Sequence, residues 1–230
     1  MWIVRHFGIG RMVAIRRVAL ILSALSHAAP ALAQRVSLQG SMGRSSSDMN
    51  WNSSNGESAS ANQTRAAFYA AVGVRGRIAR RFSLAADVQV APKGFNRTTP
   101  TMHSTFLEVP LLLLWEGSGA AAPTQWYLGA GLAPGRRLHC RRFFSGTAGP
   151  HEDDCGMASY GPLDLAPFRR WDVSQEWRVG VRRAVGQGRM VASVRLSSSL
   201  TDQEPGPESR KVTTHHFATG WLLGYEVSLK

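Results

Sequence analysis

The amino-acid sequence predicts an all-β protein, an eight-stranded antiparallel up-and-down transmembrane β-barrel. Three observations predict this fold. Apolar and polar residues alternate with period two in eight segments, the connections between the segments are alternately short and long, and the polar face of the segments carries charges of both signs. After the N-terminal region no stretch approaches 18 uninterrupted apolar residues, so a helical span is not expected.

The first 33 residues have the order of a secretory signal peptide. A lead with four arginines precedes an apolar run from Val18 to Leu25, and Ala31-Leu32-Ala33 suits cleavage after Ala33. An N-terminal anchor helix is the alternative, but the apolar run is far shorter than the roughly 20 residues of a span. Residues 34–230 are therefore predicted to form the barrel, exported to a bacterial outer membrane.

The first three predicted strands lie near residues 35–43, 66–76 and 82–93. The first is the weakest, since only Val36, Leu38 and Met42 mark its apolar face. In the second and third the even positions are mainly apolar, whereas the odd positions are small or polar and include Arg75 and Asp87.

The fourth predicted strand, near 104–116, contains the least polar stretch of the exported chain. One face is apolar from Leu107 to Trp115, and Glu108 lies on the other face with Pro110. Proline has no N–H to donate to a neighbouring strand, so a bulge or local break is expected at Pro110.

The last four predicted strands lie near 125–134, 171–183, 189–201 and 213–229. Each has one apolar face, and the final strand alternates most clearly, with Trp221, Leu223 and Tyr225 on one side. Short connections join strands two and three, four and five, and six and seven. The long connections include two predicted extracellular loops near 44–65 and 135–170, which indicates insertion from the short-turn side.

The orientation of the apolar face decides between a membrane barrel and a soluble one. A lipocalin-like periplasmic binding barrel, or a two-sheet sandwich, would bury the apolar face. Aromatic residues near the strand ends are typical of membrane girdles, and four acids and four arginines can pair inside a narrow lumen. The predicted interior charges are Arg75, Asp87, Glu108, Asp172, Glu176, Arg178, Arg182 and Arg195.

Four stretches resemble, in order, the PorT-like outer-membrane β-barrel family: residues 82–95, 106–115, 126–135 and 191–202. The core Leu107-Glu108-Val109-Pro110-Leu111 is the most specific part. The resemblance implies an eight-stranded, OmpA-type transmembrane barrel inserted by the barrel-assembly machinery. Members share no known catalytic residues, so the resemblance transfers none, and no cofactor is predicted. The chain departs from the usual terminal Phe or Trp, because it ends Val227-Ser228-Leu229-Lys230.

Cys140 and Cys155 are predicted to form a disulfide, because the chain is exported and has an even number of cysteines. A metal site is the alternative, with His139, His151 or the acidic residues 152–154 as partners. No standard ligand spacing is present, so no metal is predicted.

The chain is basic, with 27 basic and 15 acidic residues and a formal charge of +12, or +8 without residues 1–33. No nucleic-acid motif accompanies this charge, so lipid or another surface anion is the expected partner. Arginine pairs bidentately with phosphate, which suggests contacts between outer-leaflet lipid and a cluster near the membrane rim. The cluster consists of Arg136, Arg137, Arg141 and Arg142, with Arg169 and Arg170 at the far end of the loop.

These observations predict a structural or surface-interaction protein without a wide pore. The alternatives are a narrow channel or transport component, the soluble periplasmic barrel, and a lipid-modifying enzyme that would use His215 or His216 as its base. No nucleophile motif accompanies the two histidines, so catalysis is not expected.

Overall fold

The structure is a computed structural model that describes residues 36–53, 58–60, 65–95, 101–117, 122–146, 149–155, 169–201 and 212–229. The predicted signal peptide, residues 1–33, lies outside these ranges. No helix within them is long and apolar enough to cross a membrane. They contain eleven strands: β1 (Val36–Ser53), β2 (Ser58–Ser60), β3 (Arg65–Ala79), β4 (Phe82–Phe95), β5 (Thr101–Glu108), β6 (Leu111–Glu116), β7 (Thr124–Gly146), β8 (Gly149–Asp154), β9 (Trp171–Val185), β10 (Gly188–Ser199) and β11 (Val212–Ser228).

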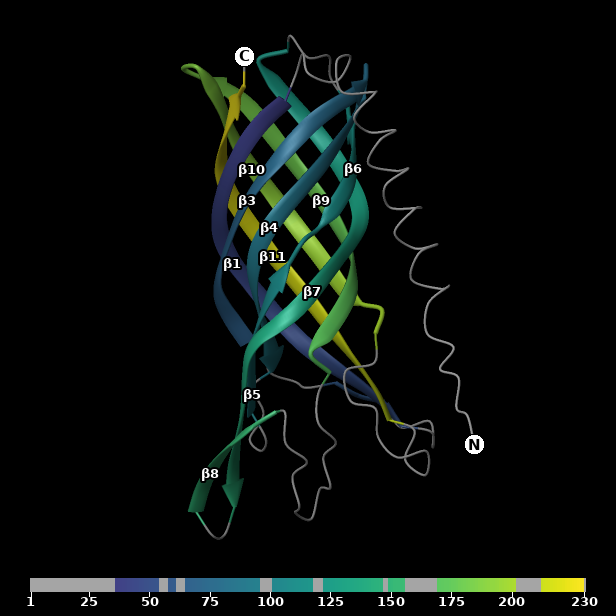
Figure 1. The fold of residues 1–230 in the computed structure, drawn as a ribbon, viewed down its shortest axis with the longest axis vertical. Coiled ribbons are helices and arrows are strands. Elements are labelled where there is room, and N and C mark those ends of the chain that lie inside the picture. The colour runs from purple at the N-terminus through teal and green to yellow at the C-terminus, as the bar shows by residue number, and fades with distance from the viewer. Residues whose placement is uncertain are drawn as a thin grey trace, which may run out of the picture.

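The strands close into an antiparallel barrel with eight positions, which confirms the predicted fold class. Neighbours in the ring follow the order of the sequence, and β1 pairs with β11 to close it. β5 and β6 share one position, because both pair with β4 on one side and with β7 on the other. β2 pairs only with β1 and β8 only with β7, outside the ring. Figure 1 shows the tilted strands, with β8 projecting beyond one end.

The fourth barrel position is interrupted at Val109 and Pro110, where the sequence predicts a break. Two backbone hydrogen bonds bridge the interruption. The amide of Asp87 donates to the Pro110 carbonyl at 3.1 Å, and the amide of Val109 donates to the Pro134 carbonyl at 2.8 Å. The barrel therefore stays closed although Pro110 has no N–H to donate.

β1 and β7 are much longer than predicted, at 18 and 23 residues. Parts of the predicted loops near 44–65 and 135–170 are thus strand. Residues 44–53 pair with β11, and residues 135–143 pair with β5. These extensions are held by backbone pairing with the neighbouring strands and have no apolar face. Alternation of apolar and polar residues therefore did not predict them.

The two ends of the barrel differ. At one end, the turn end, Arg80 and Arg81 connect β3 to β4, and Gly186 and Gln187 connect β9 to β10. Gly186 has a φ of 58°, which glycine adopts without strain. The first and last strands also meet here, where the amide of Leu229 donates to the Val36 carbonyl at 2.8 Å. The other end, the outer end, carries β2 and β8.

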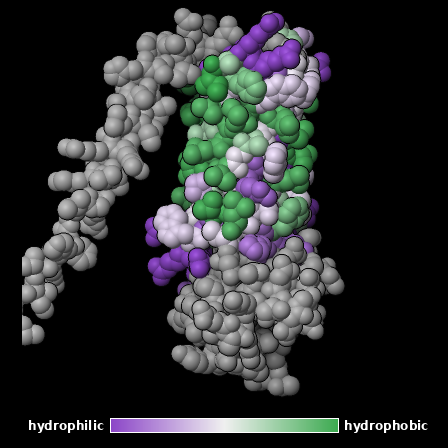
Figure 2. Space-filling view, turned by 90° about the vertical axis from the view of Figure 1, so that its right-hand side faces the viewer, coloured by the Kyte–Doolittle hydropathy of each residue, from purple (hydrophilic) through white to green (hydrophobic). Residues whose placement is uncertain are grey.

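Burial is inverted relative to a soluble protein. Large apolar side chains point outward along every strand of the ring, for example Val179, Trp221 and Leu223, whereas charged side chains are enclosed. Figure 2 shows the resulting apolar belt. Monomeric soluble proteins rarely expose such a continuous apolar surface. This distribution argues against the lipocalin-like alternative, which requires the apolar face inside.

Candidate functional site

The structure encloses all eight interior charges predicted from the sequence. None of these residues is more than 7% exposed. They come from β3, β4, β5, β9 and β10 and point inward because each lies on the polar side of its strand's alternation. They are Arg75, Asp87, Glu108, Asp172, Glu176, Arg178, Arg182 and Arg195.

At the turn end of the lumen, two carboxylates hold three arginines. Glu116 pairs with Arg75 and, at 2.8 Å, with Arg77. Glu226 pairs with Arg75 at 3.3 Å and with Arg182 at 3.2 Å. Glu116 thus ties β6 to β3, and Glu226 ties β11 to β3 and β9.

In the middle of the lumen, the ion pairs form a continuous chain. Arg178 pairs with Asp87 at 2.7 Å and with Glu176 at 2.6 Å. Arg195 pairs with Glu176 at 3.0 Å and with Glu108 at 2.8 Å. This chain links β4, β5, β9 and β10 through side chains alone.

Towards the outer end, Lys93 is the central cation. Its Nζ lies 2.5 Å from Glu108 and 2.6 Å from Asp172. Asp172 also accepts hydrogen bonds from the hydroxyls of Ser199 at 2.5 Å and Thr201 at 2.6 Å. The lumen is therefore crossed by ion pairs at three levels.

Sequence reasoning missed Lys93, Glu116 and Glu226 as interior charges. The alternation could have identified them, because each lies on the polar face of its strand. Lys93, for example, is four residues after Gln89 and therefore on the same face of β4. With these three residues and Arg142, which is also buried, the described residues include six buried carboxylates and six buried cations. Buried charges are costly unless they are paired, and here the two signs balance.

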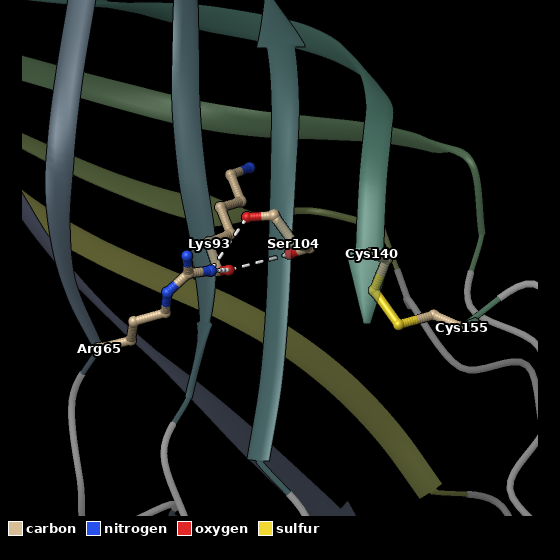
Figure 3. Close-up of a disulfide and its surroundings, with 5 residues drawn as sticks. All are labelled: Arg65, Lys93, Ser104, Cys140 and Cys155. Atoms are coloured by element: carbon tan, nitrogen blue, oxygen red, sulfur yellow. Dashed lines mark hydrogen bonds between the residues drawn. A yellow bond between two sulfur atoms is a disulfide. The ribbon is translucent and has the colours of Figure 1, made fainter. Parts of the chain in front are cut away.

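The structure joins Cys140 of β7 to Cys155, the residue that follows β8, with Cα atoms 5.5 Å apart. Both cysteines are buried. Since both sulfur atoms are in the disulfide, neither is free to bind a metal. Figure 3 shows the disulfide near the outer part of β4 and β5, where Arg65 donates to the carbonyl of Lys93 at 3.0 Å.

An open cavity of about 700 Å³ lies beside the disulfide, and we refer to it as the basic hollow. Its acidic residues are Glu152 and Asp154, both exposed. Glu152 pairs with Arg141 at 2.7 Å, and both side chains are about half exposed, 44% and 53%. The lining residues are Arg136, Arg137, Leu138, His139, Cys140, Arg141, Glu152, Asp154 and Arg170.

Arginines are crowded in the basic hollow. The amide of Arg137 donates to the Arg170 carbonyl at 2.7 Å, which holds the residues before β9 against β7. Burial lowers the pKa of Arg137; the Asp154 carboxylate raises it, and the guanidinium groups of Arg170 and Arg142 lower it again. Nη1 of Arg137 has no hydrogen-bond partner among the described residues. An anion bound in the hollow would offset the mutual repulsion of these guanidinium groups.

Arg142 does not lie where the sequence analysis predicts it. It is 1% exposed and points into the barrel, so it is wrong as a contact for outer-leaflet lipid. The cause is a register shift: Thr105 pairs with His139 but Phe106 pairs with Arg137, so Leu138 is an extra residue. One extra residue exchanges the two faces of a strand. Arg170 completes the basic hollow instead.

The two histidines of the enzyme alternative lie in different surroundings. His216 is buried, with its ring centroid 6.2 Å from that of Phe106, while His215 is partly exposed. Among the described residues, Nδ1 of either histidine has no hydrogen-bond partner.

Comparisons with known proteins identify similar folds only. No family model matches the chain, and neither does a curated protein. Neisserial surface protein A (NspA) is 13% identical, with 84% of this chain and 96% of that chain covered and a TM-score of 0.47. Ail, the attachment invasion locus protein of Yersinia pestis, is 12% identical, with 83% and 97% covered and a TM-score of 0.40. The N-terminal β-barrel domain of Pseudomonas aeruginosa OprF is 10% identical, with 81% and 96% covered and a TM-score of 0.34.

Proposed function

We propose that this chain is an exported barrel of a bacterial outer membrane, with a structural and surface-interaction role. One observation carries the proposal: the charged residues are enclosed and paired, while the apolar belt is exposed. In hydrocarbon every backbone polar group needs an internal partner, and a closed barrel satisfies this requirement. The signal-peptide pattern of residues 1–33 and the resemblance to the PorT-like family also support export and insertion by the barrel-assembly machinery.

The ion pairs favour a structural lumen over a wide pore. Three levels of charged contacts cross the interior, from Glu116 at the turn end to Lys93 near the outer end. An eight-stranded barrel is narrow enough for side chains to fill it. Steady conduction of large solutes would require these contacts to separate together.

The basic hollow is the proposed surface site, and its ligand is the phosphate of an outer-leaflet lipid headgroup. Arg136 lies over the exposed indole of Trp171, 5.9 Å from the ring centroid. Tryptophan is enriched at membrane interfaces, so Trp171 supports a position at headgroup level. Arg141 and Arg170 line the same hollow.

Binding of lipopolysaccharide to the refolded barrel in neutral detergent tests this site. The variant with Arg136→Gln, Arg141→Gln and Arg170→Gln removes three exposed charges of the hollow. At about 1 kcal/mol for each arginine at a lipid surface, we expect affinity to fall roughly 100-fold at low salt.

The matched control removes three exposed arginines at the turn end: Arg80→Gln, Arg81→Gln and Arg183→Gln. It changes the net charge equally and should leave the affinity of the hollow for lipopolysaccharide within about two-fold, because the altered charges lie farther from the hollow than a Debye length of roughly 10 Å. Equal losses in both variants would exclude a specific site. Recovery of the protein in the soluble fraction of the cell would exclude the membrane assignment itself.

A further inference from the structure

The buried charges leave the excess positive charge of the protein unexplained. Six carboxylates and six cations are buried among the described residues, so this buried set is neutral. Residues 34–230 have a formal charge of +8, which therefore lies outside it. The basic hollow at the outer end accounts for part of this excess, and the turn end carries another part.

Three exposed arginines lie at the turn end, and we refer to them as the turn-end collar: Arg80, Arg81 and Arg183. No exposed carboxylate accompanies them in the described residues of this end. The two acids there, Glu116 and Glu226, are buried and already paired with lumen arginines. Within the described part of the chain the collar thus has no neutralising partner on the surface.

The collar lies next to a cluster of aromatic side chains at the edge of the belt. The Arg81 carbonyl accepts a hydrogen bond from the Glu116 amide at 2.8 Å, which holds the turn beside Trp115. The Trp115 and Trp126 rings meet edge to face, 4.9 Å between centroids. Arg183 faces outward two residues beyond Val181, the register partner of Trp126. Figure 2 shows hydrophilic residues directly above the apolar belt at this end.

We propose that the turn-end collar binds the phosphate groups of anionic phospholipids in the leaflet that faces the turns. The inference rests on the proposed membrane insertion. Indole rings favour the interface, and an outward arginine two residues beyond them reaches the phosphate level. Arginine is the side chain that pairs bidentately with phosphate. A lipid suits this surface better than a protein does, because the aromatic cluster continues the lipid-facing belt without interruption.

Fluorescence quenching by acyl-brominated lipids tests the proposal at the collar itself. The reporter chain retains Trp115 and Trp126, and its other tryptophans are replaced by Phe: Trp2, Trp51, Trp171, Trp177 and Trp221. It is refolded into vesicles that mix phosphatidylglycerol with phosphatidylcholine, and one lipid is brominated at a time. A headgroup in contact with one collar arginine gains about 1 kcal/mol, so at low salt we expect about a five-fold preference for phosphatidylglycerol around these tryptophans.

In the reporter chain with Arg80→Gln, Arg81→Gln and Arg183→Gln, the preference for phosphatidylglycerol should disappear, so that both lipids quench equally. The control variant with Arg136→Gln, Arg141→Gln and Arg170→Gln loses the same charge at the other end and should keep the preference. Heat-dependent migration on gels identifies the folded fraction of every variant. An inserted chain without a lipid preference, or with one that survives loss of the collar, would overturn this inference alone. A chain that stays outside the bilayer would overturn the proposed membrane insertion as well.

Discussion

Replacing Glu108 by glutamine removes one charge from the lumen and hardly changes the shape of the side chain. Glu108 is fully buried and contacts Lys93 at 2.5 Å, Arg195 at 2.8 Å and the side-chain amide of Gln89 at 2.6 Å. Removing one partner of a buried ion pair costs about 3–5 kcal/mol. Lys93 and Arg195 each keep a second carboxylate, Asp172 and Glu176, so the lower end of that range, about 3 kcal/mol, is expected.

The measurement is equilibrium unfolding in urea of the barrel refolded in vesicles, followed by tryptophan fluorescence and by heat-dependent gel migration. The matched control is Glu152→Gln, which breaks the half-exposed pair with Arg141 in the basic hollow. Exposed pairs contribute about 0–1 kcal/mol, so this variant should unfold almost as the parent does. If Glu108→Gln lost less than about 1 kcal/mol, or no more than the control, the ion pairs would not be what stabilises the lumen.

Three further predictions concern the belt, the disulfide and the packing of the lumen. Leu223→Arg, on the outward side of β11, should destabilise the barrel by about 2–4 kcal/mol in vesicles, as measured by the same urea titration, and Leu223→Ile should not. Cys140→Ser with Cys155→Ser should leave barrel unfolding unchanged but speed proteolysis between residues 141 and 170, because the disulfide ties β7 to the end of β8, which lies outside the ring; resistance equal to that of the parent would contradict this. Gly180→Leu should destabilise by about 1–3 kcal/mol in that titration, because a Cβ there would lie 2.6 Å from the Tyr127 ring, and Gly76→Leu, where the added Cβ meets nothing within 4 Å, is its control.

The belt was predictable from the sequence because hydrocarbon imposes alternation on each strand that crosses it. On β10, for example, Val194 faces outward and Arg195 inward, as the period-two pattern predicts. The break at Pro110 was predictable for a local reason, the missing N–H. These features depend only on residues near one another in the chain.

Features that depend on pairing between distant strands were not predictable. The outer part of β7 has no apolar face and is a strand because β5 and β8 lie beside it. The inward direction of Arg142 follows from the extra residue at Leu138, which is recognised only from the register with β5. The sequence grouped Arg170 with the arginine cluster, but the backbone bond that holds it to Arg137, 33 positions away in the chain, is seen only in the structure. Single-sequence alternation carries no information on these contacts.

The neutrality of the lumen also determines how the barrel responds to voltage. A transmembrane potential does about 2.3 kcal/mol of work on one elementary charge moved through 100 mV. The lumen cations described above are tied to carboxylates, as Lys93 is to Asp172 and Arg178 is to Asp87, so opposing forces act on each of these pairs. An applied field can polarise these pairs but exerts no net pull along the axis. The paired charges of the interior therefore polarise in a field but do not move with it as the charges of a voltage sensor do.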